Sequence, residues 1–314
     1  MNMRKPQTLS EVIIIGGSYS GMSAAMTLGR ALRKVVLIDA GKPCNRFAPH
    51  AHNLLGSDGI APAQLHATAR AQLKLYSTIE LIEDNAISFK KDKALFTVTT
   101  KKGAEFMAEN LLLATGLKDS LPNIPGLLDC WGKSAIHCPY CHGFEFKGGQ
   151  TGILAASNEA LHMINMLMQW TSNLTIFTVE GFSFNPAALD FIHQHKIRLI
   201  TEKVTGLQHQ AGNLEAVTIR DVSGKLGSIP LKALYVMPPI RQALEQQAAL
   251  GYNLTPSGHI EVDEAGRTAT KGLYAAGDNC NRFRSLAQAM ASGITAGAMI
   301  NYDLINKQRP LPKM

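Results

Sequence analysis

Residues 12–21, which read VIIIGGSYSG, decide the fold of this chain. The first four are β-branched apolar residues, and such a short run is typical of a strand buried on both faces of a sheet. A glycine-rich turn follows, and small or apolar residues then recur at helical spacing from Met22 to Leu32. A second apolar run covers residues 35–38 and ends in Asp39. The order is therefore strand, glycine turn, helix, strand and acid.

This order is the fingerprint of a dinucleotide-binding unit. Gly16, Gly17 and Gly21 let backbone amides approach a pyrophosphate at the start of the helix, while Asp39 accepts hydrogen bonds from the ribose hydroxyls. Ser18 departs from the fingerprint, because it stands where the middle glycine usually lies. Serine is small, and the rest of the unit is intact. We therefore predict that a dinucleotide binds here, with these five residues among its contacts.

A second motif lies near the middle of the chain, where residues 137–142 read HCPYCH. Two thiols separated by two residues can close to a disulfide or open to a dithiol, so Cys138 and Cys141 are a candidate two-electron switch. The same spacing also occurs in zinc sites, and a zinc site formed with His137 and His142 stays an alternative. Flavins also carry electrons in pairs, so we predict FAD rather than NAD at the glycine turn.

The bulk composition limits the remaining possibilities. A chain of 314 residues with 46% hydrophobic and 18% charged residues suits two ordered domains. The formal charge is +7, but the basic residues are scattered, which argues against a nucleic-acid partner. No apolar stretch approaches the ~20 residues that cross a membrane, so we expect a cytoplasmic protein without a membrane partner. Its five cysteines are an odd number, which favours one catalytic pair over a disulfide framework.

Between the two motifs the pattern changes to short strands with charged turns. Three such strands, separated by lysine-rich turns, indicate an antiparallel meander between residues 86 and 108. Residues 111–114 then indicate a separate buried strand, which is closed by Thr115 and Gly116. A proline-rich crossing over residues 121–126 is typical of a linker. We therefore expect a domain boundary just before this crossing, near residue 118.

Beyond the crossing, strand and helix patterns alternate from about residue 151 to about residue 236. This alternation predicts a second α/β unit. The last segment then returns with a strand that closes on Gly277 and Asp278, where a carboxylate and backbone amides could hold the ribityl–phosphate chain of a flavin. A helix of small residues over 286–302 suits close packing over a cofactor.

Together these motifs resemble the low-molecular-weight thioredoxin reductases, within the superfamily of FAD/NAD(P) disulfide oxidoreductases. The matching positions, in the order typical of that family, are Gly16, Gly17, Gly21 and Asp39, then Ala114, Thr115 and Gly116, then Cys138 and Cys141, and finally Gly277 and Asp278. The resemblance implies an α/β fold with two Rossmann-like, three-layer ββα dinucleotide-binding domains, the second inserted into the first. Residues 1–117 and 241–314 would form a discontinuous FAD-binding domain, and residues 118–240 an inserted NAD(P)-type domain that carries the redox CxxC.

The resemblance also assigns roles. In this family the second cysteine faces the flavin and the first exchanges with the substrate, which would be the roles of Cys141 and Cys138. Ala287 and Gln288 loosely match residues whose amides reach the pyrimidine edge of the flavin. The implied activity passes electron pairs between FAD and the disulfide, and on to a thioredoxin-like protein or a small disulfide or dithiol. Members of the family are usually homodimers.

Two departures from the family concern the electron donor. Residues 155–160, at the phosphate turn of the inserted domain, read AASNEA and lack glycine, so methyl groups would hinder the approach of a pyrophosphate. Residues 178–180 read TVE, where NADPH-dependent members have a His-Arg-Arg cluster that clamps the 2′-phosphate. The choice among NADPH, NADH, another donor and no pyridine nucleotide therefore stays open.

A third departure is His142, which follows the second cysteine where reductases usually have an acid. The order Cys-Pro-Tyr-Cys-His is similar to that of flavin-dependent dithiol oxidases, which use oxygen to form disulfides in small natural products. With an ordinary pKa near 6.5, a histidine here can take up or release a proton as a thiolate reacts. The alternatives are an oxygen-dependent dithiol oxidase, a flavoprotein reductase with a donor other than NADPH, and a flavoprotein redox sensor.

The other polar residues of interest have simpler interpretations. His50 and His52 are interpreted as loop histidines, with a flavin-facing role as the alternative. Cys44, Cys130 and Cys280 have no partner at short spacing and are expected to be bystanders. Of these three, Cys280 follows closely after the predicted cofactor carboxylate and could lie near the flavin.

Overall fold

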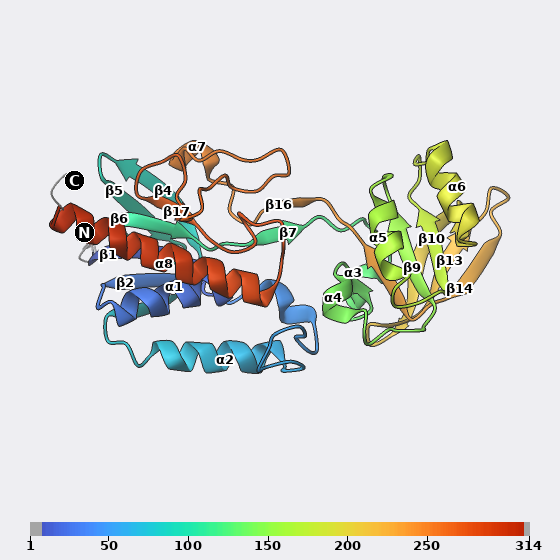
Figure 1. Cartoon of the computed structure of the whole chain (residues 1–314), viewed down its shortest axis with the longest axis horizontal. Helices are drawn as coiled ribbons and strands as arrows, with labels where there is room; N and C mark the ends of the chain where they lie inside the picture. The colour runs from blue at the N-terminus through green and yellow to red at the C-terminus, as the bar shows by residue number, and fades with distance from the viewer. Residues whose placement is uncertain (1–7, 311–314) are drawn as a thin grey trace. The chain divides into compact units, whose positions relative to one another are not determined.

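The computed structural model describes residues 8–310, and these form two compact units (Figure 1). The first unit takes in residues 8–44, 63–118 and 240–310, and the second takes in residues 45–62 and 119–239. The segment 45–62 therefore clusters with the second unit, although the sequence-based boundaries put it in the first domain. Within residues 8–310, none of the helices combines the length and the apolar character that crossing a membrane requires.

The first unit is built on a mixed β-sheet. Its elements are β1 (Thr8–Ile15), α1 (Tyr19–Arg30), β2 (Val35–Asp39), α2 (Pro62–Leu73), β3 (Ile79–Glu83), β4 (Ala86–Asp92), β5 (Leu95–Thr100), β6 (Glu105–Leu113), β7 (Leu117–Asp119), β16 (Ile240–Gln242), α7 (Gln247–Leu250), β17 (Leu273–Ala275) and α8 (Leu286–Gln308). The sheet order is β3-β2-β1-β6-β5-β4, and β17 pairs with β6. β7 and β16 pair separately with each other. The neighbours β3, β2, β1, β6 and β17 are parallel, whereas β4, β5 and β6 form the predicted antiparallel meander.

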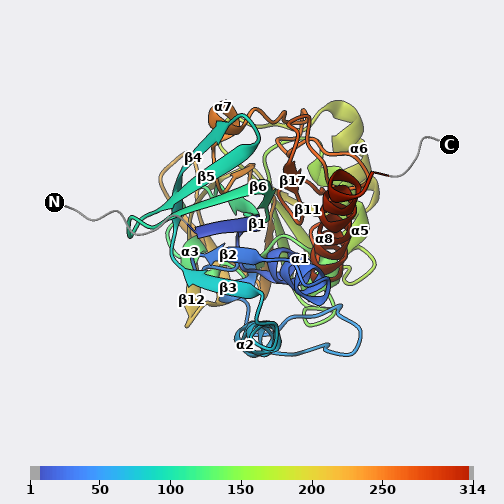
Figure 2. The same cartoon turned by 90° about the vertical axis from the view of Figure 1, so that its left-hand side faces the viewer.

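Alternation along β1 decides which side chains each face of this sheet buries. Val12 and Ile14 pack in one cluster with α1, α2 and α8, whereas Ile13 and Ile15 pack in another with the aromatic side chains of the meander. All four are buried, as a strand in the middle of a covered sheet requires. Figures 1 and 2 show α1 and α8 lying side by side over one face of the sheet.

α8 approaches α1 closely at two glycines. A Cβ added at Gly293 would overlap the carbonyl oxygen of Ser20, and one added at Gly297 would lie 2.9 Å from the carbonyl oxygen of Ala24. The small residues that the sequence shows in this helix therefore serve a helix–helix contact. The helix also extends to residue 308, beyond the predicted end at residue 302.

β6 is one strand, where the sequence pattern predicted two. The polar residues Glu109 and Asn110 interrupt the apolar pattern, yet the strand continues from residue 105 to residue 113. On one edge, its first half pairs antiparallel with β5 and its second half pairs parallel with β17. On the other edge, β1 pairs with it from residue 106 to residue 113 and so spans the junction. The buried Asn110 amide donates to the carbonyl oxygen of Glu11 at 3.3 Å. A satisfied polar side chain is therefore tolerated inside the sheet.

The second unit has three layers. Its elements are α3 (Leu127–Cys130), β8 (Ala135–Ile136), α4 (Pro139–His142), β9 (Thr151–Ala155), α5 (Ala160–Leu167), β10 (Leu174–Thr178), α6 (Pro186–Gln194), β11 (Arg198–Ile200), β12 (Lys203–Gln210), β13 (Asn213–Arg220), β14 (Leu226–Pro230) and β15 (Ala233–Val236), with a 3-10 helix η1 (Cys44–Phe47) at its border. A parallel sheet β11-β10-β9-β15-β8 is covered by α5 and α6 on one face and by the antiparallel sheet β12-β13-β14 on the other. This is the predicted ββα arrangement.

Candidate active site

The glycine turn after β1 is too tight for any side chain. Gly16 has φ +105°, and a Cβ added to it would overlap the carbonyl oxygen of Ala114. A Cβ added to Gly17 would lie 2.6 Å from the carboxyl carbon of Asp39, whose Oδ1 accepts a hydrogen bond from the Gly17 amide at 3.1 Å. Gly21 is packed equally closely against the Gly16 carbonyl. This cradle brings bare backbone to the start of α1, which is what a dinucleotide phosphate requires.

Serine in place of the middle glycine does not close the cradle. Ser18 is the N-cap residue of α1 in an extended conformation, and its side chain makes no capping hydrogen bond. Ser20, in the first turn, is buried, and its Oγ has no hydrogen-bond partner within the described residues. A buried hydroxyl left without a partner at a helix N-terminus suits a ligand that can accept from it. The residues at this turn therefore fit FAD.

The other predicted cofactor residues lie at the same edge of the sheet. The Ala114 amide donates to the Ile15 carbonyl at 2.8 Å, and the Ala276 amide donates to the Leu113 carbonyl at 3.0 Å. The carboxyl ends of β1, β6 and β17 therefore meet. As a result, Thr115 and Gly116, as well as Gly277 and Asp278, follow directly from the strand ends beside the glycine turn.

Asn279 holds this edge together, and sequence reasoning missed it. Its side chain is fully buried, and Nδ2 donates to the Leu113 carbonyl at 2.8 Å and to Thr115 Oγ1 at 3.4 Å. The sequence signal that could have identified Asn279 is its position directly after Asp278. The carboxylate oxygen Oδ2 of Asp278 lies 3.5 Å from Arg284 Nε. Asn279 thus fixes the loop that carries the predicted cofactor carboxylate.

Ala287 and Gln288 are in the first turn of α8. The N-cap residue Ser285 accepts a hydrogen bond from the Gln288 amide at 3.1 Å. The Gly277 amide donates to Ser292 Oγ at 2.9 Å, so the second turn of α8 is hydrogen-bonded to the loop of the predicted cofactor carboxylate. The loosely matched pair is therefore brought to the same region of the first unit as the other predicted contacts.

Two residues of α2 also reach the glycine turn, and no sequence motif pointed to them. Arg70 Nη1 lies 3.3 Å from Asp39 Oδ2 and its Nη2 lies 2.6 Å from Glu83 Oε1. His66 Nε2 is 3.0 Å from the Gly17 carbonyl. These contacts join residues that are far apart in the sequence, so only the folded chain shows that α2 packs beside the glycine turn.

The two cysteines of the central motif form a disulfide in the second unit. Cys138 and Cys141 are joined, with their Cα atoms 5.3 Å apart. Cys138 is the N-cap residue of the short α4, and Pro139 occupies the first helical position, where proline is favoured. Tyr140 is 56% exposed, and its ring meets Trp170 edge to face at 5.8 Å. Both cysteine residues are half-buried, and the exposed Tyr140 provides an aromatic surface beside the disulfide.

His142 ends α4 directly after the second cysteine. Burial lowers the pKa of its imidazole, an effect that the charge of Glu145 opposes and that of His52 reinforces. At neutral pH the ring is therefore neutral and able to accept a proton from a thiol. His52, for which the sequence predicts a loop position with a flavin-facing role as the alternative, comes from the segment 45–62 of the second unit.

The zinc alternative drew on both histidines of the motif. His137 stacks on Trp131 with ring centroids 5.7 Å apart, and the two sulfurs are bonded to each other. Within residues 8–310, no three histidine, cysteine or acidic side chains are grouped as ligands for a metal ion. The geometry at the motif is thus that of a disulfide beside an imidazole.

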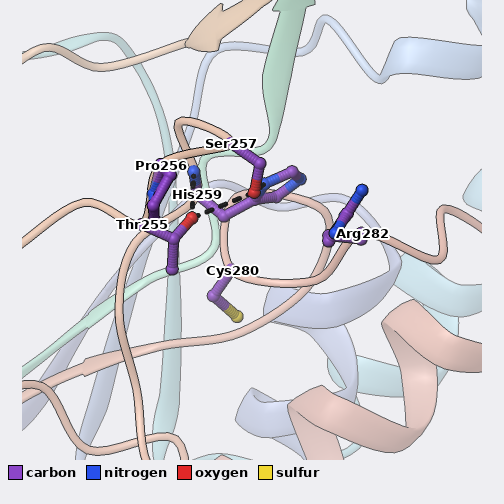
Figure 3. A pocket seen from close by; sticks show the side chains of 6 residues that line it. All are labelled: Thr255, Pro256, Ser257, His259, Cys280 and Arg282. Atoms are coloured by element: carbon purple, nitrogen blue, oxygen red, sulfur yellow. Dashed lines mark hydrogen bonds between the residues drawn. The ribbon is translucent and has the colours of Figure 1, made fainter. Parts of the chain in front are cut away.

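Cys280 lines a cavity of about 430 Å³ in the first unit (Figure 3). Burial, followed by the nearby charge of Asp278, raises the pKa of this thiol to about 12, so it stays protonated. Across the cavity, Ser257 Oγ is 3.0 Å from His259 Nδ1 and 3.1 Å from Thr255 Oγ1. The residues beside this cavity therefore include no reactive thiolate.

The other two free cysteines do not line the cavity. Cys44 is exposed and Cys130 is buried.

The turn between β9 and α5 differs from the glycine turn of the first unit. It contains no glycine, and Glu159 stands at the N-cap of α5. Glu180, after β10, pairs with Lys203 at 2.8 Å, and this contact lowers the pKa of the carboxyl. Sequence reasoning found no cation here because Lys203 comes from β12. In a site of this fold, Glu159 therefore stands where the pyrophosphate of a nucleotide would bind, and Glu180 stands where its ribose would bind.

Comparisons with known proteins show the family to which the chain belongs. The family described as pyridine nucleotide-disulphide oxidoreductase matches residues 10–293. The chain is 29% identical over 309 residues to thioredoxin reductase tcpT from Claviceps purpurea, which covers 94% of each chain.

Solved structures are similar as well. An oxidoreductase from Agrobacterium tumefaciens is 35% identical, with a TM-score of 0.86 over 96% of this chain and 99% of that one. Thioredoxin reductase from Streptococcus pyogenes is only 20% identical, yet it reaches a TM-score of 0.87 over 95% of this chain and 99% of that one, which shows a shared fold.

Proposed function

The chain belongs to the pyridine nucleotide-disulphide oxidoreductase family, and from this premise we propose that it passes electron pairs between FAD and the Cys138–Cys141 disulfide. It is an oxidoreductase of the thioredoxin reductase type and a flavoprotein. The observation that carries the proposal is the half-buried disulfide at the start of α4 with a neutral imidazole directly after it. The final electron partner would be a thioredoxin-like protein or a small disulfide or dithiol.

The residues proposed to hold FAD all belong to the first unit. They are Gly16, Gly17, Ser18, Gly21 and Asp39, then Ala114, Thr115 and Gly116, then Gly277 and Asp278, and finally Ala287 and Gln288. Bound FAD would supply the two-electron oxidation or reduction of the disulfide. The units are accordingly proposed to be a discontinuous FAD-binding domain and an inserted domain of the NAD(P) type.

Cys138, Cys141 and His142 have different roles in the proposed thiol–disulfide exchange. A substrate thiolate attacks Cys138 Sγ, the bond between the two cysteines breaks, and Cys141 leaves as a thiolate. The second substrate thiolate then attacks the mixed disulfide, and Cys138 leaves as the second thiolate. His142 accepts a proton from a substrate thiol, since only the thiolate is nucleophilic. The reverse sequence reduces a substrate disulfide.

An anaerobic titration tests this proposal. We expect a small dithiol to bleach the flavin of the purified protein, and the variant Cys138→Ser to lose this response while keeping its flavin. Cys44→Ser removes an exposed cysteine outside the disulfide and should behave as the wild type. A flavin that responds equally in Cys138→Ser and wild type would show that its electrons bypass the disulfide.

An oxygen-dependent dithiol oxidase is the second candidate. Glu159 favours it, because a carboxylate at the phosphate turn opposes the pyrophosphate of NADPH and NADH. Glu180 opposes only the 2′-phosphate of NADPH. Neutral His142 favours it as well, because oxidation of a dithiol needs a base. We expect oxygen uptake with peroxide release on adding a dithiol, and no anaerobic bleaching by either nucleotide. Rapid bleaching by NADPH or NADH would instead identify a reductase.

A further inference from the structure

Trp170 packs directly on the short helix that carries the redox disulfide. Its indole meets the ring of Tyr140 edge to face, with the ring centroids 5.8 Å apart. A Cβ added at Gly143 would lie 3.0 Å from the Nε1 and Cε2 atoms of the same indole. Tyr140 lies between the two cysteines in the sequence, and Gly143 is the C-cap residue of α4. One side chain therefore contacts the motif both between the cysteines and just after them.

This contact explains why residue 143 is glycine. Gly143 has φ −64° and ψ −31°, an ordinary helical conformation that any residue adopts, so its backbone does not require glycine. Its amide donates to the Pro139 carbonyl oxygen at 2.6 Å, and an added Cβ would also lie 2.6 Å from that oxygen. Glycine is needed here because the last turn of α4 and the indole of Trp170 leave no space for a methyl group.

The segment that carries Trp170 is fixed by hydrogen bonds within the second unit. The Trp170 amide donates to the Leu167 carbonyl at the end of α5, and its own carbonyl accepts from the Gly148 amide, both at 2.9 Å. The next residue, Thr171, is buried, and its Oγ1 donates to the Gly149 carbonyl at 2.8 Å. The indole therefore presses on α4 from a firm support.

α4 depends on such packing for its conformation. A helix of four residues is not stable on its own, and the N-cap residue Cys138 makes no side-chain capping hydrogen bond. The chain enters α4 from a held position, because the ring of His137 stacks on Trp131. Trp170 supplies the corresponding contact on the other side of the motif.

We propose that Trp170 is a positioning residue that holds α4 in the conformation that brings the sulfurs of Cys138 and Cys141 together. The inference rests on the proposed function of this disulfide as a redox switch. In the dithiol form, each further conformation open to the loop lowers the effective concentration of one thiol toward the other. By fixing α4, Trp170 raises that concentration and favours the disulfide in its equilibrium with an external thiol.

Anaerobic equilibration of the holoprotein with glutathione redox buffers tests this proposal. Two glutathione thiols lose two electrons and two protons and become one disulfide, while the Cys138–Cys141 bond breaks and gives two thiols. Trp170→Leu should lower the equilibrium constant for closing the protein disulfide about 5–30-fold, the equivalent of freeing the backbone of one residue. Trp170→Phe keeps an aromatic ring and should restore most of the loss. Alkylation of the thiols followed by mass spectrometry measures the fraction in each form.

A matched control exists in the same unit. Phe182 and Phe184 form another edge-to-face pair, with ring centroids 4.9 Å apart, and Phe182 is likewise only partly buried. Phe182→Leu should leave the equilibrium constant at the wild-type value. An equal shift in Phe182→Leu and Trp170→Leu, or no shift in Trp170→Leu, would overturn the inference.

Amide hydrogen exchange of the disulfide form gives a second, independent measurement. The amides of Cys141 and Gly143 should exchange faster in Trp170→Leu than in the wild type and in Phe182→Leu. Gly143→Ala, whose methyl group would meet the indole, should show the same acceleration and serves if Trp170→Leu does not fold. Unchanged exchange in these variants would overturn the inference. A wild-type disulfide that does not react with glutathione would count against the proposed function alone.

Discussion

A histidine beside a redox disulfide is useful only in the protonation state that the reaction needs. Burial is the largest influence on His142 and lowers its pKa, so the ring is neutral at pH 7 and can act as a base. At the glycine turn of the predicted cofactor site, single residues matter for their shape and not for their protonation. There the absence of a side chain is what matters, because Gly16 and Gly17 leave no space for a Cβ.

Replacing His142 by asparagine removes the base and keeps a polar side chain of smaller size. The rate at which a small dithiol reduces the protein should fall about 10²–10⁴-fold, the usual contribution of a general base. Anaerobic stopped-flow absorbance of the flavin measures this rate. His193→Asn, on the exposed side of α6, is the control. An equal loss in both variants would show that the effect is not specific to the site.

Gly17→Ala should abolish or strongly weaken FAD binding. The new methyl group would lie 2.6 Å from the carboxyl carbon of Asp39 and displace that side chain or the turn. The measurement is the ratio of flavin to protein after purification and after adding FAD. Gly224→Ala adds the same methyl group at a turn of the second unit that has φ +87° and open space around it, so it strains the backbone without steric overlap and should keep full flavin content. A yellow Gly17→Ala protein would contradict the predicted site.

At the scale of elements, the contact between α1 and α8 decides how the first unit is assembled. α1 begins at the glycine turn, and α8 begins beside the loop that carries Gly277. Gly293 and Gly297 let the two helices approach backbone to backbone. Close packing of these helices therefore positions both predicted ends of the cofactor site at once.

Gly297→Val should destabilise the first unit by about 1–3 kcal/mol, the usual cost of adding volume to a packed interface. A Cβ at this position already lies 2.9 Å from the Ala24 carbonyl oxygen. Ala298→Val, at the next and exposed position of α8, costs only about 0.5 kcal/mol through helix propensity. Midpoints of urea unfolding at unchanged slope compare the two variants. Similar losses in both would mean that the interface tolerates the valine.

At the scale of the whole molecule, each unit has its own buried clusters, two in the first and two in the second. Each unit also contains a histidine whose pKa is lowered first of all by burial. These are His259 in the first unit and His142 in the second. The pH dependence of stability therefore belongs to both units.

The free energy of unfolding should decrease as the pH falls from about 7.5 to about 5.5. Both histidines have a pKa below the ordinary 6.5, so the unfolded chain binds more protons than the folded one in this range. The stabilisation is complete above the unfolded pKa and is lost as the pH drops toward the folded one. Urea midpoints at several pH values measure it. The double variant His142→Asn/His259→Asn should flatten the slope, and an unchanged slope would contradict the assignment.

Local order along the chain determined the first unit's strand, glycine turn, helix, strand and acid, and also the redox motif. These features depend on neighbours in sequence: apolar runs form buried strands, and only glycine accepts φ +105° at position 16 without strain. The comparisons confirm the α/β fold and the kind of enzyme that this order predicted.

Only the tertiary structure decided which distant side chains meet. It joined the two predicted strands around Asn110 into one, because β6 changes partners along its length. It brought Lys203 to Glu180, and it placed the loop histidine His52 against Glu145. Contacts between remote segments follow from how sheets and loops close, and no local pattern of residues records that closure.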